Sequence, residues 1–236
     1  MAQGQGEATG SLPDPGTDTA YRAAAFDVLG ALTYAELSAF LRLSCDADLA
    51  PTLTATAELA RLAVLEFGHH ELLCERLVEL GADPEEAMAP FVAAVDGFHE
   101  RTAPSTWLEG LVKFSVGDGI AQDFYREVSA LLDDRTRELM LGALADTGQA
   151  AFVVREVRRA IAEDPTLTGR LALWGRRLVG EALSQAQQVA AERDAFATLL
   201  VSGSPGAQGG LTELVSMFDR ITARHARRMA DLGLRA

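Results

Sequence analysis

The feature that most constrains this chain is a run of leucines at helical spacing between residues 58 and 80. They follow one another at intervals of three, four and eight residues, which places them on one face of an α-helix. These leucines are Leu59, Leu62, Leu65, Leu73, Leu77 and Leu80. The same face carries a carboxylate and an imidazole, Glu66 and His69. The pattern therefore predicts an amphipathic helix whose buried face holds ionisable groups.

Glu66 and His69 are three residues apart, so their side chains stand one above the other on the helix. In helical bundles this Glu-x-x-His spacing builds carboxylate-bridged di-iron and dimanganese sites. A buried carboxylate is otherwise costly unless it pairs with a cation or accepts several hydrogen bonds. A structural alternative is therefore an ion pair with an arginine such as Arg61 or Arg177. Helical phase alone also allows His70, four residues after Glu66, as the nitrogen ligand.

The composition favours an all-α fold. Alanine and leucine dominate, β-branched residues are sparse, and aromatic residues make up only 6% of the 236 residues. The formal net charge of −13 opposes non-specific attraction to a phosphate backbone. A nucleic-acid partner would need a local basic patch, and the last helical segment has one that we interpret as a solvated helix face. Its members are Arg220, Arg224, Arg227 and Arg228.

Three observations point to a soluble cytoplasmic protein. Cys45 and Cys74 lie within helical patterns without paired metal-ligand spacing, which indicates buried, reduced thiols. The N-terminus has no positively charged segment followed by an apolar run, which a secretory signal requires. We find no apolar stretch long enough to span a bilayer without glycine, charged or polar interruption, so we expect no membrane contact.

We expect a single helical domain over residues 19–236. It follows a tail, residues 1–18, that is rich in Gly, Pro, Asp and Thr and is predicted to be disordered. The core is predicted to be a bundle over about residues 20–162. Additional helices follow over about residues 165–232, with a flexible loop at residues 202–210 between them.

Glu36 lies on the apolar stripe of the first predicted helix, residues 21–45. It points inward with the neighbouring leucines, which is an awkward place for a carboxylate without a partner. The short loop that follows makes the next helix antiparallel to the first. Glu36 and Glu66 then reach a similar depth in the bundle.

Asp118 is a candidate from the third long helix, predicted over residues 106–132. Glycines on both sides of Asp118 permit close approach by another helix or a ligand. We expect Asp118 to face the core and Asp123 to lie nearer its edge. The predicted bundle interior therefore contains three carboxylates, which is more than chance usually places there. They belong to Glu36, Glu66 and Asp118.

The remaining candidates are weaker. In the helix predicted over residues 135–162, Asp146 and Gln149 repeat the three-residue spacing of Glu66 and His69 with poorer ligand types. His225 in the last helix is either a third nitrogen ligand or a plain core residue. His99, near the end of a short helix, is expected to be exposed.

In these residues the chain resembles the ferritin-like proteins, and within them the group similar to tRNA-(2-methylthio-N6-isopentenyladenosine) hydroxylase. The resemblance covers about residues 20–162. It rests on Glu36, on Glu66-Phe-Gly-His69, on the sequence Val-Gly-Asp-Gly-Ile-Ala-Gln-Asp-Phe-Tyr at residues 116–125, and on the order of the helices. It implies a ferritin-like antiparallel four-helix bundle with additional C-terminal helices.

The resemblance also implies a non-haem di-iron oxygenase, with Glu36 as the first-helix carboxylate, Glu66 as the bridging carboxylate and His69 as the first imidazole. The second half departs from the family. An aspartate stands where the family has glutamate, and Asp-Thr-Gly-Gln replaces Glu-x-x-His. An amide is a much poorer iron ligand than imidazole. The predicted site therefore holds one or two iron ions, or none, and its ligands are Glu36, Glu66, His69, Asp118 and Asp146, with Gln149 and His225 as weaker members.

Two classes of function follow from the resemblance. The first is an O2-dependent hydroxylase that acts on tRNA or on a small molecule. The second is a metal-free bundle that has lost redox chemistry and serves as a binding or scaffold protein, which the replacements at residues 146 and 149 favour. Both classes of function are compatible with a homodimer. An iron-storage shell is a third option, and it would need many subunits.

Overall fold

The computed structural model describes residues 19–145, 149–202 and 210–236. Within these ranges the chain forms helices joined by short turns and no strand, which confirms the predicted all-α fold. The predicted tail, residues 1–18, lies outside the described residues, as do residues 203–209 of the predicted loop.

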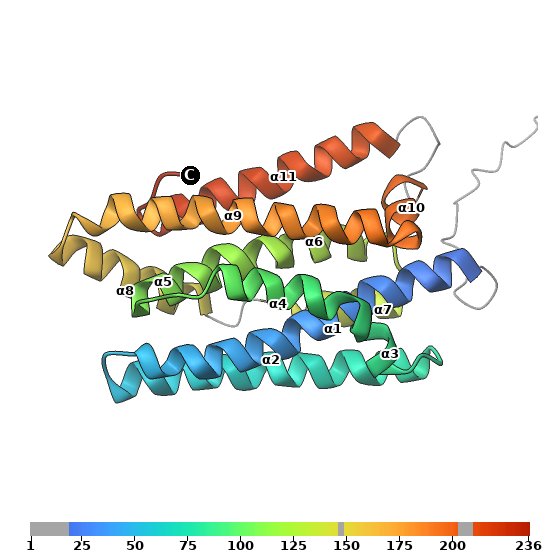
Figure 1. Ribbon diagram of the computed structural model, residues 1–236, viewed down its shortest axis with the longest axis horizontal. Helices are drawn as coiled ribbons and strands as arrows, with labels where there is room; N and C mark the ends of the chain where they lie inside the picture. The colour runs from blue at the N-terminus through green and yellow to red at the C-terminus, as the bar shows by residue number, and fades with distance from the viewer. Residues whose placement is uncertain (1–18, 146–148, 203–209) are drawn as a thin grey trace, which may run out of the picture.

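The first two long helices form an antiparallel pair along one side of the molecule (Figure 1). They are α1 (Thr19–Asp46) and α2 (Leu53–Glu79), joined through the 3-10 turn η1 (Ala47–Leu49). The Thr52 side chain caps α2 by accepting a hydrogen bond from the Ala55 amide. Gly81 follows the helix with a positive φ of 80°, a conformation that glycine adopts without strain.

A short connection crosses next to α1. It consists of α3 (Pro84–Met88), the 3-10 turn η2 (Ala89–Phe91) and α4 (Val92–Arg101). Asp83 caps α3 by accepting a hydrogen bond from the amide of Glu86. Gly30 of α1 permits the crossing, because a Cβ there would lie 2.1 Å from the carbonyl oxygen of Ala87.

The third predicted helix contains a π-helical segment. It is divided into α5 (Trp107–Lys113), the π-helical η3 (Phe114–Asp118) and α6 (Gly119–Ser129). A π-helical turn widens the backbone by one residue and often occurs at functional sites. Here it ends on Asp118, between the two glycines that the sequence singled out.

The later helices are shorter than predicted. The helix expected over residues 135–162 is broken into α7 (Asp134–Ala143) and α8 (Gln149–Glu163), and the intervening sequence Asp-Thr-Gly consists of poor helix formers. The predicted additional helices are α9 (Leu167–Glu192), α10 (Asp194–Ser202) and α11 (Gly210–Asp231), with a break at Arg193 between the first two.

The buried apolar side chains form two clusters, one toward each end of the bundle. One contains Leu43 and Leu62, and the other contains Leu32 and Leu73. Glu36 lies between Leu32 and Leu43 on α1, and Glu66 lies between Leu62 and Leu73 on α2. The charged residues therefore lie at the junction of two apolar cores.

Residues 19–49 are long and apolar enough to cross a membrane by length and composition, but 61% of the apolar window is buried inside the protein, as a core helix would be. Two expectations about single side chains are wrong. Cys45 is exposed near the end of α1, and Cys74 is only partly buried. Leu65 is 37% exposed. It precedes the buried Glu66 and points about 100° away from it around the helix.

Candidate metal centre

Three side chains from α1 and α2 converge in the protein interior. Glu36, Glu66 and His69 each offer a ligand atom, and these atoms lie within 4.8 Å of one another. The Nδ1 atom of His69 is 3.5 Å from an oxygen of Glu36 and 3.4 Å from an oxygen of Glu66. Glu36 is 5% exposed and Glu66 is 4% exposed. Because α1 and α2 are antiparallel, their two carboxylates meet at one depth.

The imidazole of His69 has an unsatisfied nitrogen in this cluster. Its Nδ1 atom is buried, and neither of the two long carboxylate contacts meets the directional requirement of a hydrogen bond. The cluster therefore offers a set of ligand atoms for a cation. It consists of two carboxylate oxygens and one imidazole nitrogen that face one another without a well-directed hydrogen bond. Imidazole and carboxylate are ligands for iron, manganese and zinc, so these residues fit a transition-metal ion.

The protonation of the cluster follows from its burial. Burial, together with the neighbouring Glu66, raises the pKa of Glu36 well above its usual value. Burial also opposes ionisation of Glu66, but the neighbouring side chains of Glu36 and His69 outweigh it and lower the pKa of Glu66. The carboxylates of Glu36 and then Glu66 raise the pKa of His69 to about 9. Without an ion, Glu36 and His69 therefore both hold protons more strongly than they do in water.

The structure distinguishes between the two adjacent histidines, which helical phase left open. The Nδ1 atom of His70 lies 3.0 Å from the carbonyl oxygen of Thr33, and its Nε2 atom lies 3.6 Å from the sulfur of Cys74. His70 is therefore engaged with the backbone of α1. His69 is the histidine that faces the two carboxylates.

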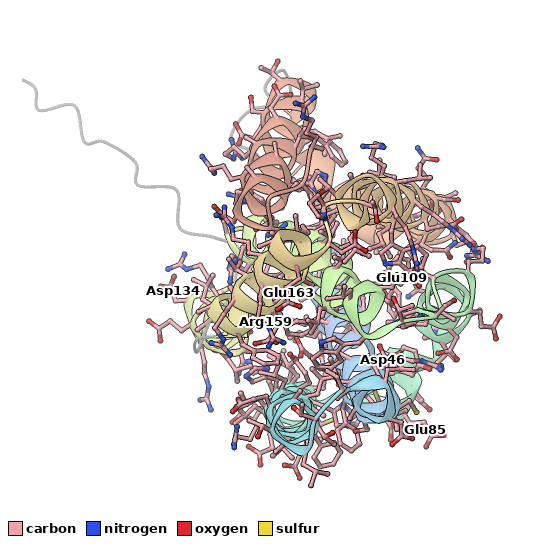
Figure 2. All side chains as sticks on the ribbon, turned by 90° about the vertical axis from the view of Figure 1, so that its left-hand side faces the viewer. Asp46, Glu85, Glu109, Asp134, Arg159 and Glu163 are labelled. Atoms are coloured by element: carbon pink, nitrogen blue, oxygen red, sulfur yellow. The ribbon has the colours of Figure 1, made fainter. Side chains whose placement is uncertain are left out.

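Asp118 lies near the cluster but outside it. Burial raises the pKa of Asp118 to about 7, the ammonium of Lys113 opposes this rise, and the Glu66 carboxylate adds to it. Asp118 also lines a cavity of about 10 Å³, space for about one water molecule. Lys113 and Asp46 line the same cavity. Asp46, labelled in Figure 2, lies at the end of α1 beside α5.

Lys113 is a residue that the sequence reasoning missed. It is 4% exposed, and its ammonium lies 5.6 Å from the centre of the Phe98 ring. Burial lowers its pKa, while the carboxylates of Asp118 and Asp46 oppose this change. A signal was present in the sequence, because Lys113 is the only lysine of the chain and it lies within an apolar run.

The expectation that His99 is exposed is wrong. His99 is 7% exposed and lines the same cavity as Lys113 and Asp118, and its Nδ1 atom has no hydrogen-bond partner. Burial, then the charges of Lys113 and Arg42, lower the pKa of His99 to about 3. The imidazole is therefore neutral at pH 7. It is buried because α4 packs against η3, where the Phe98 ring would lie 3.1 Å from a Cβ on Gly117.

Asp123 is fully buried rather than near the edge of the core. It forms ion pairs with Arg224 at 3.1 Å and with Arg228 at 2.7 Å. Glu127, one turn further along α6, pairs with Arg220 at 2.8 Å and also with Arg224. The interpretation of these arginines as a solvated face is therefore wrong for Arg224 and Arg228, which are partly buried against the carboxylates of α6, whereas Arg220 and Arg227 are exposed.

The other predicted ligands do not join the cluster among the described residues. His225 is 8% exposed and lies near Asp123 and Arg228, whose charges act on it. Asp146 is outside the described residues. Gln149 begins α8, and the described side chains do not include it. The assignments of Asp146 and Gln149 as ligands stay predictions.

The fold and the site together define a class: a helical bundle in which carboxylates and an imidazole from neighbouring helices meet in the interior. The chain belongs to a family of this kind. Residues 19–203 match the family described as Ferritin-like domain, actinomycetes. No curated protein matches the sequence. The ferritin-like part of the predicted resemblance is thus confirmed, and the match carries no support for its narrower tRNA hydroxylase part.

Proposed function

We propose that this ferritin-like protein is a cytoplasmic, iron-dependent oxygenase that hydroxylates a small molecule, with one iron ion held by Glu36, Glu66 and His69. The observation that carries the proposal is the convergence on His69 Nδ1 of two buried carboxylate oxygens, at 3.4 and 3.5 Å, with no hydrogen bond that satisfies the nitrogen. An iron(II) ion held there would activate O2 for insertion of one oxygen atom into a C–H bond, while two electrons from an external reductant and two protons would convert the other oxygen atom to water.

The charge balance of the interior supports one ion rather than two. With a neutral His69, the charges of one divalent ion, Glu36 and Glu66 add up to +2 − 2 = 0. Asp118 and Lys113 line one cavity and carry opposite charges when both are ionised. A second divalent ion beside Asp118 would add positive charge next to the Lys113 ammonium. Burying uncompensated charge is strongly unfavourable.

Lys113 supports the same conclusion by its position. Its side chain is buried and shares a cavity with Asp118 and Asp46. A compact ammonium on a flexible stem fits such a space better than the planar guanidinium that the chain uses at its other basic positions. The ammonium supplies the positive charge that a second ion would bring to Asp118.

The groups around the cluster suit an environment from which water is largely excluded. Burial and then the charge of Glu36 raise the pKa of Tyr125, so this phenol keeps its proton beside the carboxylate. Leucines of the two apolar cores flank the cluster on both sides. The residues of this chain therefore hold the ligands in place and exclude water from them.

The surface supports a small molecule as substrate rather than tRNA. The net charge is −13, and Arg220, Arg224 and Arg228 are paired with carboxylates of α6. Affinity for a phosphate backbone arises from free basic side chains that release counterions.

The test is metal analysis after anaerobic loading with Fe(II). We expect about one iron per chain in the wild type and a loss of most of it in Glu66→Ala. Glu75→Ala is the matched control, because Glu75 is an exposed glutamate on the same helix. Substoichiometric iron that Glu66→Ala does not change would reject the site. Two irons per chain would reject the single-ion form and leave the site standing.

One observation favours a second candidate, a metal-free bundle that acts as a binding or scaffold protein. Glu36 and His69 both have a raised pKa, so proton binding, like an ion, lowers the negative charge of the buried cluster. A ligand that binds only the folded state stabilises it by about 2.7 kcal/mol at a hundred times its Kd. A melting temperature indifferent to Fe(II), Mn(II) and Zn(II) would therefore favour the scaffold.

A further inference from the structure

The outer face of α2 exposes large apolar side chains. Leu53 is 88% exposed, Val64 is 67% exposed and Val78 is 61% exposed. In Figure 1 α2 forms the lower edge of the molecule, with α1 on its inner side. Figure 2, which looks along the helices, also shows α2 at one edge and α11 at the opposite one. Contiguous exposed apolar surface of this kind marks interaction sites in soluble proteins.

The exposed side chains of α2 repeat every seven residues. Steps of four and three residues alternate along the whole helix, which is the spacing with which one helix packs into the groove of another. The stripe consists of Leu53, Ala57, Ala60, Val64, Phe67, Glu71, Cys74 and Val78. Its spacing fits a second helix better than a flat surface.

The sizes of these side chains fit a second copy of the same helix. Ala57 and Ala60 are small, and Val64 and Phe67, further along the stripe, are large. If two copies of α2 cross antiparallel with a twofold axis at the level of Leu62, Ala57 faces the partner's Phe67 and Ala60 faces the partner's Val64. Each large side chain then meets a small one. A parallel pair would instead place phenylalanine against phenylalanine and alanine against alanine.

The charges at the ends and the centre fit the same arrangement. The antiparallel register brings Glu71 to the start of the partner's α2, where the positive end of the helix dipole stabilises a carboxylate. Arg61, which lies close to the axis, is paired with Glu58 of its own helix at 2.7 Å. That pairing limits its repulsion from the partner's Arg61.

The face runs along most of α2. From Leu53 to Glu71 the stripe is about 27 Å long, and the exposed Leu65 and Leu72 of the same helix lie next to it. Residues 1–18 contain only Met1 and Leu12 as large apolar side chains, so they offer little to cover this stripe.

We propose that the outer face of α2 is the twofold interface of an antiparallel homodimer of this protein. The proposal is independent of the metal centre. In sedimentation velocity at micromolar concentrations we expect the wild type to be a dimer and Val64→Glu to be a monomer with unchanged helix content. Val215→Glu is the control, because Val215 is 54% exposed on α11, and it should stay a dimer. A monomeric wild type, or a Val64→Glu variant that remains dimeric, would overturn the proposal.

The register is tested by disulfide cross-linking in a chain in which both native cysteines are replaced by serine. Leu53 and Glu71 are about 27 Å apart on one helix, far beyond the reach of a disulfide. The double variant Leu53→Cys with Glu71→Cys should therefore form disulfides only between chains, and most of it should run as a dimer after oxidation. Leu53→Cys alone should stay monomeric on a denaturing gel, because the two copies of residue 53 lie at opposite ends. Cross-linking of the single variant, or no cross-linking of the double variant, would contradict the antiparallel register.

Discussion

Metal binding by Glu36, Glu66 and His69 should release protons and should strengthen as the pH rises. When no ion is bound, the pKa of Glu36 is raised well above its usual value and that of His69 is about 9. A metal ion binds the carboxylate and the neutral imidazole, so both groups must lose their protons first. An incoming divalent ion therefore displaces up to two protons from the cluster.

The size of this effect follows from the pKa of His69. At about pH 7 the imidazole lies about two units below its pKa of about 9, so about 1% of it is neutral. Protonation of His69 alone then weakens binding about 100-fold, or about 2.7 kcal/mol. Affinity should fall about tenfold for each unit by which the pH drops below about 9, and more steeply where Glu36 is also protonated.

Without an ion, the stability of the fold should change with pH in the opposite direction. The pKa of His69 is raised from 6.5 to about 9 in the folded protein. The stabilisation by protonated His69 is therefore fully present below pH 6.5 and is lost as the pH rises through about 9. The melting temperature of the metal-free protein should fall over this range, whereas the gain on adding metal should grow.

Titration calorimetry with Mn(II) measures both quantities without redox chemistry. Repeating the titration in two buffers of different ionisation enthalpy gives the number of protons released. We expect between one and two protons at about pH 7 and fewer at about pH 10. The Glu75→Ala variant should behave as the wild type. An affinity that does not change between these pH values, or binding without proton release, would refute the assignment of these three residues as ligands.

Three further predictions follow. Lys113→Gln removes the buried ammonium beside Asp118, so the iron content should rise from about one toward two per chain. The control variant Lys113→Arg should stay near one iron per chain. An unchanged iron content in Lys113→Gln would contradict the charge argument. Arg228→Ala leaves a buried carboxylate with one partner fewer and should destabilise the protein by about 2 kcal/mol in urea unfolding, against less than about 0.5 kcal/mol for the exposed Arg227→Ala. Gly30→Ala should lower the stability by more than about 2 kcal/mol, because the new Cβ would lie 2.1 Å from a backbone oxygen of α3, and a stable variant would show that α3 can move away.

The local features of this protein are determined by its sequence. The 3.6-residue period, the Asp83 cap and Gly81 after α2 predict the helix ends because the interactions that set them lie within a few residues. The approach of Glu36 to Glu66 follows as well, since a short loop forces two helices to be antiparallel and so fixes their relative depth. This part of the candidate site, the approach of Glu36 to Glu66, can therefore be predicted from the first two helices alone.

Only the tertiary structure decided which groups face one another across helices. One residue on a helix corresponds to a rotation of about 100°, so a small change in helix orientation exchanges His69 for His70 or turns His99 inward. The burial of Lys113 beside Asp118 and the pairing of Asp123 with arginines of α11 depend on segments far apart in the chain. Whether a charged side chain is solvated or buried is determined by the helix packed against it, and a single helix's sequence does not contain that information.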